Sequence, residues 1–334
     1  MSLIYIACVV IILAGLKAAS SVIVPFLLAI FIAIVISPAM LYMQKLKIGR
    51  LFSFLIVTVL FLSILGFLGN IIFNTIAEFT ANLPELQNRF RGITNNFIQK
   101  ANSYEFINID ESMIGLDVGM IVNQFTTILK KTGFIISKGF FIFMMVAFIV
   151  FESSVMEEKI KYLSKINRKN AVFFNNFIKN LKKYLLIKTI ASIATGITIG
   201  FLLWIAGVPY APLWGILAFI LNYIPTIGSI IAVLPTLFVT LSSMSLGVSV
   251  WVILIYLFVN VLIGNIIEPR FMGQGLGIST FVVLVSLLLW GFVFGIGGLF
   301  LAIPLTMSIK IALKSNPDTR FLSVMLSNKV SQSV

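Results

Sequence analysis

Long apolar runs recur along the chain and set its expected fold class. Most are about twenty residues long, enough for a helix to cross a hydrocarbon core about 30 Å thick. A membrane β-barrel would show short alternating strands instead. We therefore predict an all-α, polytopic membrane protein with about eight membrane helices. The runs fall at about residues 3–16, 22–43, 51–73, 133–151, 185–206, 213–241, 248–267 and 279–309.

Two of these runs, 213–241 and 279–309, are too long for one straight crossing and carry helix breakers near their centres. Proline removes a backbone donor and glycine frees φ, so each run should break there. The breakers of the first run are Pro225 and Gly228, and those of the second are Gly295, Gly297 and Gly298.

The two broken runs also share a pattern. A Trp-Gly pair occurs at Trp214 and again at Trp290, and a glycine precedes a proline by seven residues at Gly228 and again at Gly297. Interrupted helices in corresponding positions of two halves are typical of a transporter binding site. We predict an inverted pair of re-entrant hairpins. Kinked single spans are the alternative, since glycine and proline are common in membrane helices and favour close packing.

Composition and charge agree with a membrane protein. Hydrophobic residues make up 60% of the chain and charged residues 10%, against about 25% charged in soluble domains. The net charge of +13 lies largely in loops between apolar runs, where it sets orientation, so we expect no nucleic-acid partner. The loop at 44–50 and the segment 152–188, with nine Lys or Arg against three acids, are predicted to be cytoplasmic, as are both termini. The N-terminus lacks the basic start of a signal peptide and is read as a membrane helix.

The chain lacks the residue types that several kinds of catalytic and metal site require. The chain has no histidine and a single cysteine, Cys8, which excludes histidine triads, HExxH zinc sites, disulfides within the chain and cysteine zinc clusters. No GxxxxGK[ST] sequence occurs, so direct ATP drive is unsupported. We expect no enzyme activity, no metal site and no cofactor.

Two polar segments show helical periodicity. In the segment 74–132, expected outside, a stripe spaced 4, 3, 4, 3, 4 predicts a helix that packs on its own domain or on another subunit, and Pro84 predicts a helix start nearby. In 152–184 an apolar stripe with lysines elsewhere predicts a basic amphipathic helix at the lipid headgroups. Calmodulin-like or nucleic-acid binding is a weaker alternative, because nothing beyond the charge supports it. The first stripe is Phe79, Leu83, Leu86, Phe90, Ile93 and Phe97; the second is Phe174, Phe177, Leu181 and Tyr184, with Lys179, Lys182 and Lys183 off the stripe.

Glu268 and Arg270 are the only charged residues between Lys188 and Lys310. A carboxylate at membrane depth is costly and usually faces a cavity and a partner. We therefore interpret Glu268 as the residue that exchanges a proton or binds a cation, with Arg270 favouring its ionised form or pairing with it when the site is empty. An ion pair that anchors a helix end at the membrane interface is the alternative.

A polar pathway is expected to accompany Glu268. Amides at Asn222, Asn260 and Asn265 can bind a polar solute or a cation, and broken helices at Pro225 and Gly295 can expose carbonyl groups to it. The predicted pathway is Asn222, Pro225, Gly228, Asn260, Asn265, Glu268, Arg270, Gly295, Gly297 and Gly298.

The carboxyl-terminal part of the chain resembles the autoinducer-2 exporter family of bacterial membrane proteins. The resemblance rests on "NYIPTIG" at 222–228, "EPRFMG" at 268–273 and "LLWGFVFGIGGLFLAIPLT" at 288–306, whereas the first 180 residues match only in hydropathy. It implies about eight membrane helices, a homo-oligomer and transport in the bacterial cytoplasmic (inner) membrane. Members are linked to export of the furanone-type signal autoinducer-2, and others to exchange of sodium or lithium for protons.

The resulting hypothesis is a secondary transporter that exports a small polar solute or a monovalent cation, coupled to a proton or sodium gradient. An oligomeric channel or structural membrane protein is the alternative, and an intramembrane enzyme is disfavoured. The partners are then the substrate, the lipid bilayer and other copies of the chain. The expected segments are N-terminal membrane helices at 1–73, an extracytoplasmic helical segment at 74–132, a membrane helix at 133–151, a cytoplasmic amphipathic segment at 152–184, a transport core at 185–314 and a cytoplasmic tail at 315–334.

Overall fold

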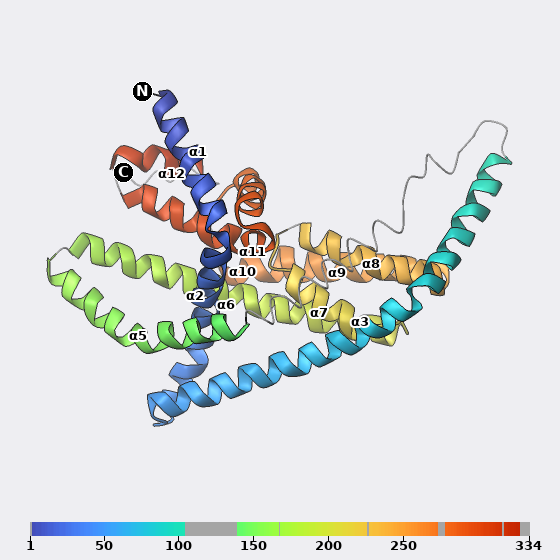
Figure 1. Ribbon diagram of the computed structural model, residues 1–334, viewed down its shortest axis with the longest axis horizontal. Coiled ribbons are helices and arrows are strands. Elements are labelled where there is room, and N and C mark those ends of the chain that lie inside the picture. Colours follow the sequence, from blue (N-terminus) through green and yellow to red (C-terminus); the bar gives the residue numbers. More distant parts are fainter. Residues whose placement is uncertain are drawn as a thin grey trace. The chain divides into compact units, whose positions relative to one another are not determined.

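The computed structural model describes residues 2–103, 139–166, 168–225, 227–272, 278–315 and 317–327. These residues form helices and turns, with one isolated bridge between Ile278 and Ser327, and the all-α prediction is confirmed (Figure 1). The α-helices are α1 (Ser2–Ala18), α2 (Ser20–Lys45), α3 (Arg50–Asn102), α5 (Gly139–Ile166), α6 (Arg168–Ile205), α7 (Ala211–Leu221), α8 (Ile227–Ser243), α9 (Leu246–Val259), α10 (Glu268–Met272), α11 (Thr280–Ser315) and α12 (Arg320–Met325), with a π-helix at Asn260–Ile267 and a 3₁₀ turn at Pro317–Thr319.

Within the described ranges, five helical stretches are long and apolar enough to cross a membrane. Such stretches make this a multi-pass membrane protein, while the predicted number of about eight membrane helices stays a prediction. The stretches are Ser20–Lys45, Arg50–Lys100, Phe177–Ile205, Leu246–Met272 and Thr280–Lys314.

The chain divides into two compact units. Unit 1 comprises Met1–Val57, Lys138–Ile190 and Ile267–Val334, and Unit 2 comprises Thr58–Ser137 and Ala191–Ile266. Each unit has its own apolar core. The core of Unit 1 gathers residues of α2, α6 and α11, and that of Unit 2 gathers residues of α3 and α6 to α9.

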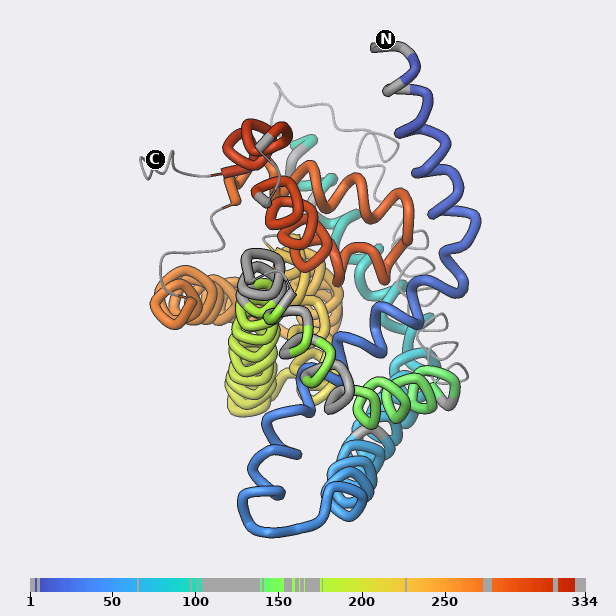
Figure 2. The backbone as a smooth tube through the Cα atoms, turned by 90° about the vertical axis from the view of Figure 1, so that its left-hand side faces the viewer, coloured from blue at the N-terminus to red at the C-terminus, as the bar shows by residue number. Residues whose placement is uncertain are grey.

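The stretch α11 is a folded-back hairpin and not a straight span. Gly295 has φ 62° and ψ −143°, outside the helical region, and a Cβ on Gly298 would collide with the carbonyl of Trp290. Trp290 Nε1 donates to Thr306 Oγ1 at 3.0 Å, although sixteen residues span about 24 Å in a straight helix. Thr306 in turn donates to Ser286 Oγ at 2.8 Å. The chain reverses direction within this stretch in Figure 2.

A second hairpin joins α7 to α8. The Gly228 amide donates to the Ile224 carbonyl at 3.1 Å and the Ile227 amide to the Pro225 carbonyl at 2.6 Å, and a Cβ on Gly228 would collide with the Leu221 carbonyl. The helix α7 has 11 residues, a length of about 16 Å. The predicted breaks of both apolar runs are therefore confirmed, whereas their placement in the membrane stays a prediction.

The stripe on α3 packs inside Unit 2. Phe79 and Leu86 are buried, and Leu83 and Phe90 pack against the same core. The Phe79 ring meets the ring of Trp214 edge-on, with 6.0 Å between centroids. The interpretation as packing on its own domain thus holds for these four positions. Ile93 is exposed, and the side chain of Phe97 lies outside the described part.

The predicted helix start near Pro84 is wrong, because α3 runs from Arg50 to Asn102 through Pro84. Proline lacks only one backbone donor, so the helix loses one internal hydrogen bond there. Leu83 and Leu86 pack on the core to either side. Tertiary packing of an apolar face supplies most helix stability in proteins, which accounts for the continuity.

The segment 152–184 forms the end of α5 and the start of α6. Tyr184 is buried and Leu181 packs with it in the core of Unit 1, while Lys179, Lys182 and Lys183 are exposed. The amphipathic stripe is confirmed at these positions, and its apolar side faces the protein. Phe177 is half-buried, and the side chain of Phe174 lies outside the described part. Contact of the lysines with lipid headgroups stays a prediction.

The glycines at the two reversals give a testable prediction. Gly228→Ala and Gly298→Ala should each lower the free energy of unfolding by about 1–3 kcal/mol, since the added methyl group meets a backbone carbonyl. Thermal unfolding of the detergent-purified protein measures this. Gly69→Ala in α3 is the control, because nothing lies within 4 Å of its added Cβ. Equal midpoints for all three variants would contradict the close contacts.

Candidate functional site

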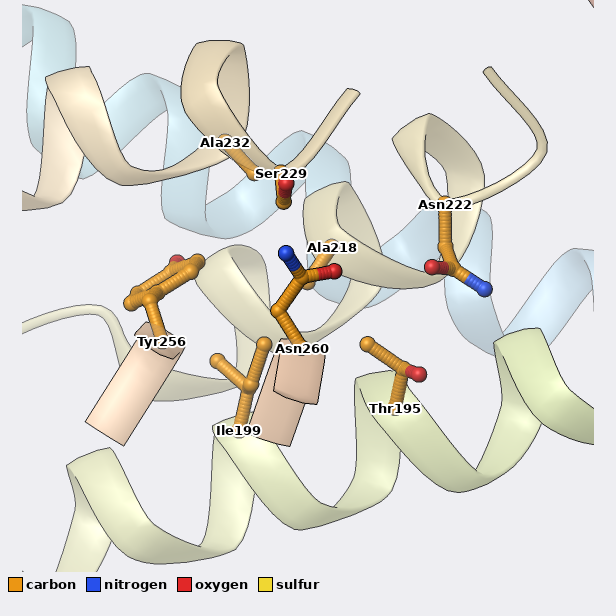
Figure 3. A pocket seen from close by; sticks show the side chains of 8 residues that line it. All are labelled: Thr195, Ile199, Ala218, Asn222, Ser229, Ala232, Tyr256 and Asn260. Atoms are coloured by element: carbon orange, nitrogen blue, oxygen red, sulfur yellow. The ribbon is translucent and has the colours of Figure 1, made fainter. Parts of the chain in front are cut away.

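Unit 2 contains a small hollow, partly open to the outside, with a cavity volume of about 10 Å³, the space of about one water molecule. Four helices and the start of the π-helix contribute to it, and Figure 3 shows its lining. Five of the eight lining side chains carry hydroxyl or amide groups, and none is charged. The lining residues are Thr195, Ile199, Ala218, Asn222, Ser229, Ala232, Tyr256 and Asn260.

Asn260 occupies the middle of this hollow. Its carboxamide points into the space between α6 and the α7–α8 hairpin in Figure 3. Asn260 is also the first residue of the π-helix Asn260–Ile267. Stretches of π-helix are rare and frequently occur at functional sites. The local backbone and the side-chain direction therefore both mark Asn260.

Two other polar side chains of the hollow, Asn222 and Tyr256, are held by hydrogen bonds. Asn222 follows the last residue of α7, and its Nδ2 donates to Ser192 Oγ on α6 at 3.0 Å. The Tyr256 hydroxyl lies 3.0 Å from Thr236 Oγ1. These hydrogen bonds fix the two side chains in place, and their partners Ser192 and Thr236 lie outside the lining of the hollow. Uncharged groups that both donate and accept hydrogen bonds suit hydroxyl and carbonyl groups of a small molecule.

Unit 1 contains a buried ion pair between α6 and α10. Lys188 Nζ donates to Glu268 Oε1 at 2.9 Å and to Oε2 at 3.0 Å. The two side chains are 7% and 12% exposed. A buried charge needs such a partner, because removing one member leaves the other uncompensated.

The predicted pairing of Glu268 with Arg270 is wrong. Arg270 is exposed and forms no ion pair within the described part of the chain. Side chains two residues apart on a helix point in nearly opposite directions, so Glu268 and Arg270 do not face each other on α10. The partner of Glu268 is Lys188, which lies eighty residues earlier in the chain.

A signal for Lys188 exists in the sequence. The apolar stripe Phe177, Leu181 and Tyr184 continues to Lys188 at a spacing of 4, 3 and 4 residues. A lysine at the next position of a buried stripe should itself be buried, and a buried lysine requires an acidic partner. Glu268 is the only acid between Lys188 and Asp318.

The remaining predicted site residues have diverse positions. Asn222 and Asn260 meet in one hollow, whereas Asn265 is exposed. Gly297 lies against the Val24 side chain of α2. Pro225 and Gly228 form the turn of the first hairpin, and Gly295 and Gly298 that of the second.

Apolar helices long enough to cross a bilayer, hairpins that fold back and a polar hollow are features of a multi-pass membrane transporter. The family model "AI-2E family transporter" matches residues 6–317, and the chain belongs to this family. The resemblance noted in the carboxyl-terminal motifs is thereby confirmed, and it extends over nearly the whole chain.

Two relatives cover almost all of the chain. A Haemophilus influenzae protein named "Putative transport protein" is 35% identical over 97% of this chain and 95% of its own length. The Escherichia coli protein named "AI-2 transport protein TqsA" is 31% identical over 96% of this chain and 93% of its own length. Both names denote transport, as the family does.

The ion pair predicts different effects of substituting two basic residues, Lys188 and Arg270. Lys188→Met should lower the free energy of unfolding by about 3–5 kcal/mol, because it leaves Glu268 buried without its counter-charge. Arg270→Met should change it by less than about 0.5 kcal/mol, as exposed positions do. Denaturant or thermal unfolding in detergent checks both values.

The double variant Lys188→Met with Glu268→Gln completes the cycle. Since both charges are removed together, it should be more stable than Lys188→Met alone. A larger loss for Arg270→Met than for Lys188→Met would contradict the pairing.

Proposed function

We propose that this chain is a secondary active transporter that exports a small, polar, uncharged solute of the autoinducer-2 kind, driven by an ion gradient. The supporting observation is the small hollow in Unit 2, which is lined by Asn222, Asn260, Thr195, Ser229 and Tyr256. It has room for about one water molecule, so the helices around it must move apart to admit the solute. The name of the E. coli relative supports this substrate class.

The chemistry of the hollow favours a neutral molecule. A charged solute leaving water would need a counter-charge, and the lining offers only amides, hydroxyls and apolar groups. A polyhydroxylated solute would exchange its hydrogen bonds with water for bonds to these groups. An analogue without the hydroxyls would leave the buried polar groups unpaired and would be rejected.

Coupling is assigned to the ion pair in Unit 1. Glu268 is a buried carboxylate that can take up and release a cation or a proton, and Lys188 is its partner. Two stretches of the chain carry residues of both sites: α6 has Lys188 and Thr195, and the stretch from α9 to α10 has Asn260 and Glu268. A change at the ion pair can therefore be passed along continuous helices.

The proposed membrane arrangement has about eight membrane helices and two re-entrant hairpins that enter from opposite sides. The short helix α7, about 16 Å long, supports re-entry, because it covers only about half of a 30 Å hydrocarbon core. Both termini are placed in the cytoplasm of a bacterial cell, with the protein in the cytoplasmic membrane as a homo-oligomer. The bias of basic residues toward 44–50 and 152–188 supports this orientation.

A monovalent cation is the second candidate substrate. The buried carboxylate of Glu268 favours it, since intramembrane acids commonly line ion pathways. Ion exchange without solute movement would then be the whole activity.

Transport by vesicles tests the proposal. Inside-out vesicles that contain the protein should accumulate labelled autoinducer-2 against its gradient when an ion gradient is imposed. Asn260→Leu should reduce the rate at least about tenfold, because it removes a central hydrogen-bonding group from the hollow. Asn265→Leu, at an exposed position, is the matched control and should transport normally.

Other outcomes separate the alternatives. Solute movement that never exceeds equilibration would indicate a channel. Sodium or lithium exchange for protons with no effect of autoinducer-2 would indicate the cation exchanger. Equal rates for Asn260→Leu and Asn265→Leu would show that the hollow is not the solute site.

A further inference from the structure

We propose that the Lys188 ammonium stands where a coupling cation would bind at Glu268, so that the coupling ion of this transporter is the proton and not sodium or lithium. This inference rests on the proposed function and specifies its driving ion. The geometry points to it, because Nζ contacts both carboxylate oxygens, at 2.9 Å and 3.0 Å.

The contact satisfies the carboxylate in the way a bound monovalent cation would. One positive charge sits against both oxygens, and the Lys188 and Glu268 side chains are 7% and 12% exposed. A metal ion could reach the carboxylate only if Nζ moved away. It would also need several further oxygen ligands, as hard cations do, whereas the ammonium brings its own charge on a covalent tether.

The neighbouring side chains are mostly apolar. One helical turn before Lys188 lie Tyr184 and Leu185, and one turn after Glu268 lies Met272, and these three belong to the core of Unit 1. Besides Lys188, Tyr184 is a buried titratable group on α6. Arg270 on α10 is exposed, and Lys310 on α11 is half-buried, one turn beyond Met307. The other residues of this core on α2 and α11 are Phe31, Ile34, Val35, Val282, Val283, Ile303 and Met307, and Ile278 joins them from just before α11.

Protonation gives the pair two states. A proton that joins Oε1 or Oε2 converts the carboxylate into a neutral carboxyl group, and Lys188 keeps its charge but loses its counter-charge. An unpaired buried ammonium is strongly unfavourable, so the protonated state favours a conformation in which Nζ reaches water. Release of the proton restores the pair. The lysine thus converts proton binding into a conformational preference and excludes metal cations.

Cation binding by the purified protein tests the inference without any solute. Thermal unfolding is measured in sodium, lithium or choline chloride at equal concentration. The wild-type midpoint should be the same in all three salts. Lys188→Ala vacates the cation position and leaves room for water to supply the further oxygen ligands, so sodium or lithium should raise its midpoint relative to choline, because a ligand that binds only the native state stabilises it. Adding Glu268→Gln to Lys188→Ala should abolish that rise.

A milder substitution protects the test against misfolding. Lys188→Gln keeps a donor for the carboxylate and removes the charge, and it should show the same sodium or lithium effect if Lys188→Ala does not fold. Stabilisation of the wild type by sodium or lithium over choline would overturn the inference. So would the absence of any cation effect in the folded Lys188 variants.

A flux measurement separates this inference from the proposed function. Wild-type vesicles should move labelled autoinducer-2 under a pH gradient in sodium-free buffer, and a sodium gradient at constant pH should drive nothing. Solute movement that follows sodium would overturn the inference and leave the exporter intact. No solute movement under either gradient would count against the proposed function, while the unfolding experiment still decides the coupling ion.

Discussion

Away from water, a backbone amide or carbonyl without a partner costs several kcal/mol, and this constraint bears on both broken runs. A buried chain that reverses direction must bond its turn groups internally. The Gly228 amide bonds to the Ile224 carbonyl, and the legs of α11 are tied by the bond from Trp290 to Thr306. Such turns need close backbone approach, which Gly228 and Gly298 permit because they lack a Cβ.

The two units bury different kinds of polar side chain. Unit 2 holds uncharged amides and hydroxyls around a hollow, and Unit 1 holds two opposite charges in direct contact. Neither arrangement leaves an isolated charge away from water. In the proposed transporter, the neutral solute and the coupling ion would thus be bound by separate groups, and α6 and the stretch from α9 to α10 supply residues to both.

Local sequence rules predicted what depends on the backbone, and they were wrong where tertiary contacts decide. The helix breaks at Pro225 and Gly295 follow from residue type alone, and the stripe from Phe79 to Phe90 follows from periodicity. Pro84 remains inside α3 because packing outweighs one missing hydrogen bond. Glu268 pairs with Lys188, eighty residues away, and a rule based on adjacency chose Arg270.

The sequence spacing of the two broken runs also differs by one residue from their structural correspondence. Spacing to the following proline pairs Gly228 with Gly297, but contact with the opposite leg pairs Gly228 with Gly298. The turn around Pro225 and the turn around Gly295 differ in geometry, and only coordinates show which glycine faces the other leg. Gly297 instead contacts Val24.

The hairpin turns have an electrostatic consequence for selectivity. At each turn the carboxyl end of one helix meets the amino end of the next, so opposite partial charges of about half an elementary charge lie side by side. Their fields cancel within a short distance, in contrast to a lone helix terminus, which attracts ions of one sign. Asn222 and Ser229 flank such a junction. In the proposed transporter, the hollow beside it would therefore favour an uncharged solute over an ion of either sign.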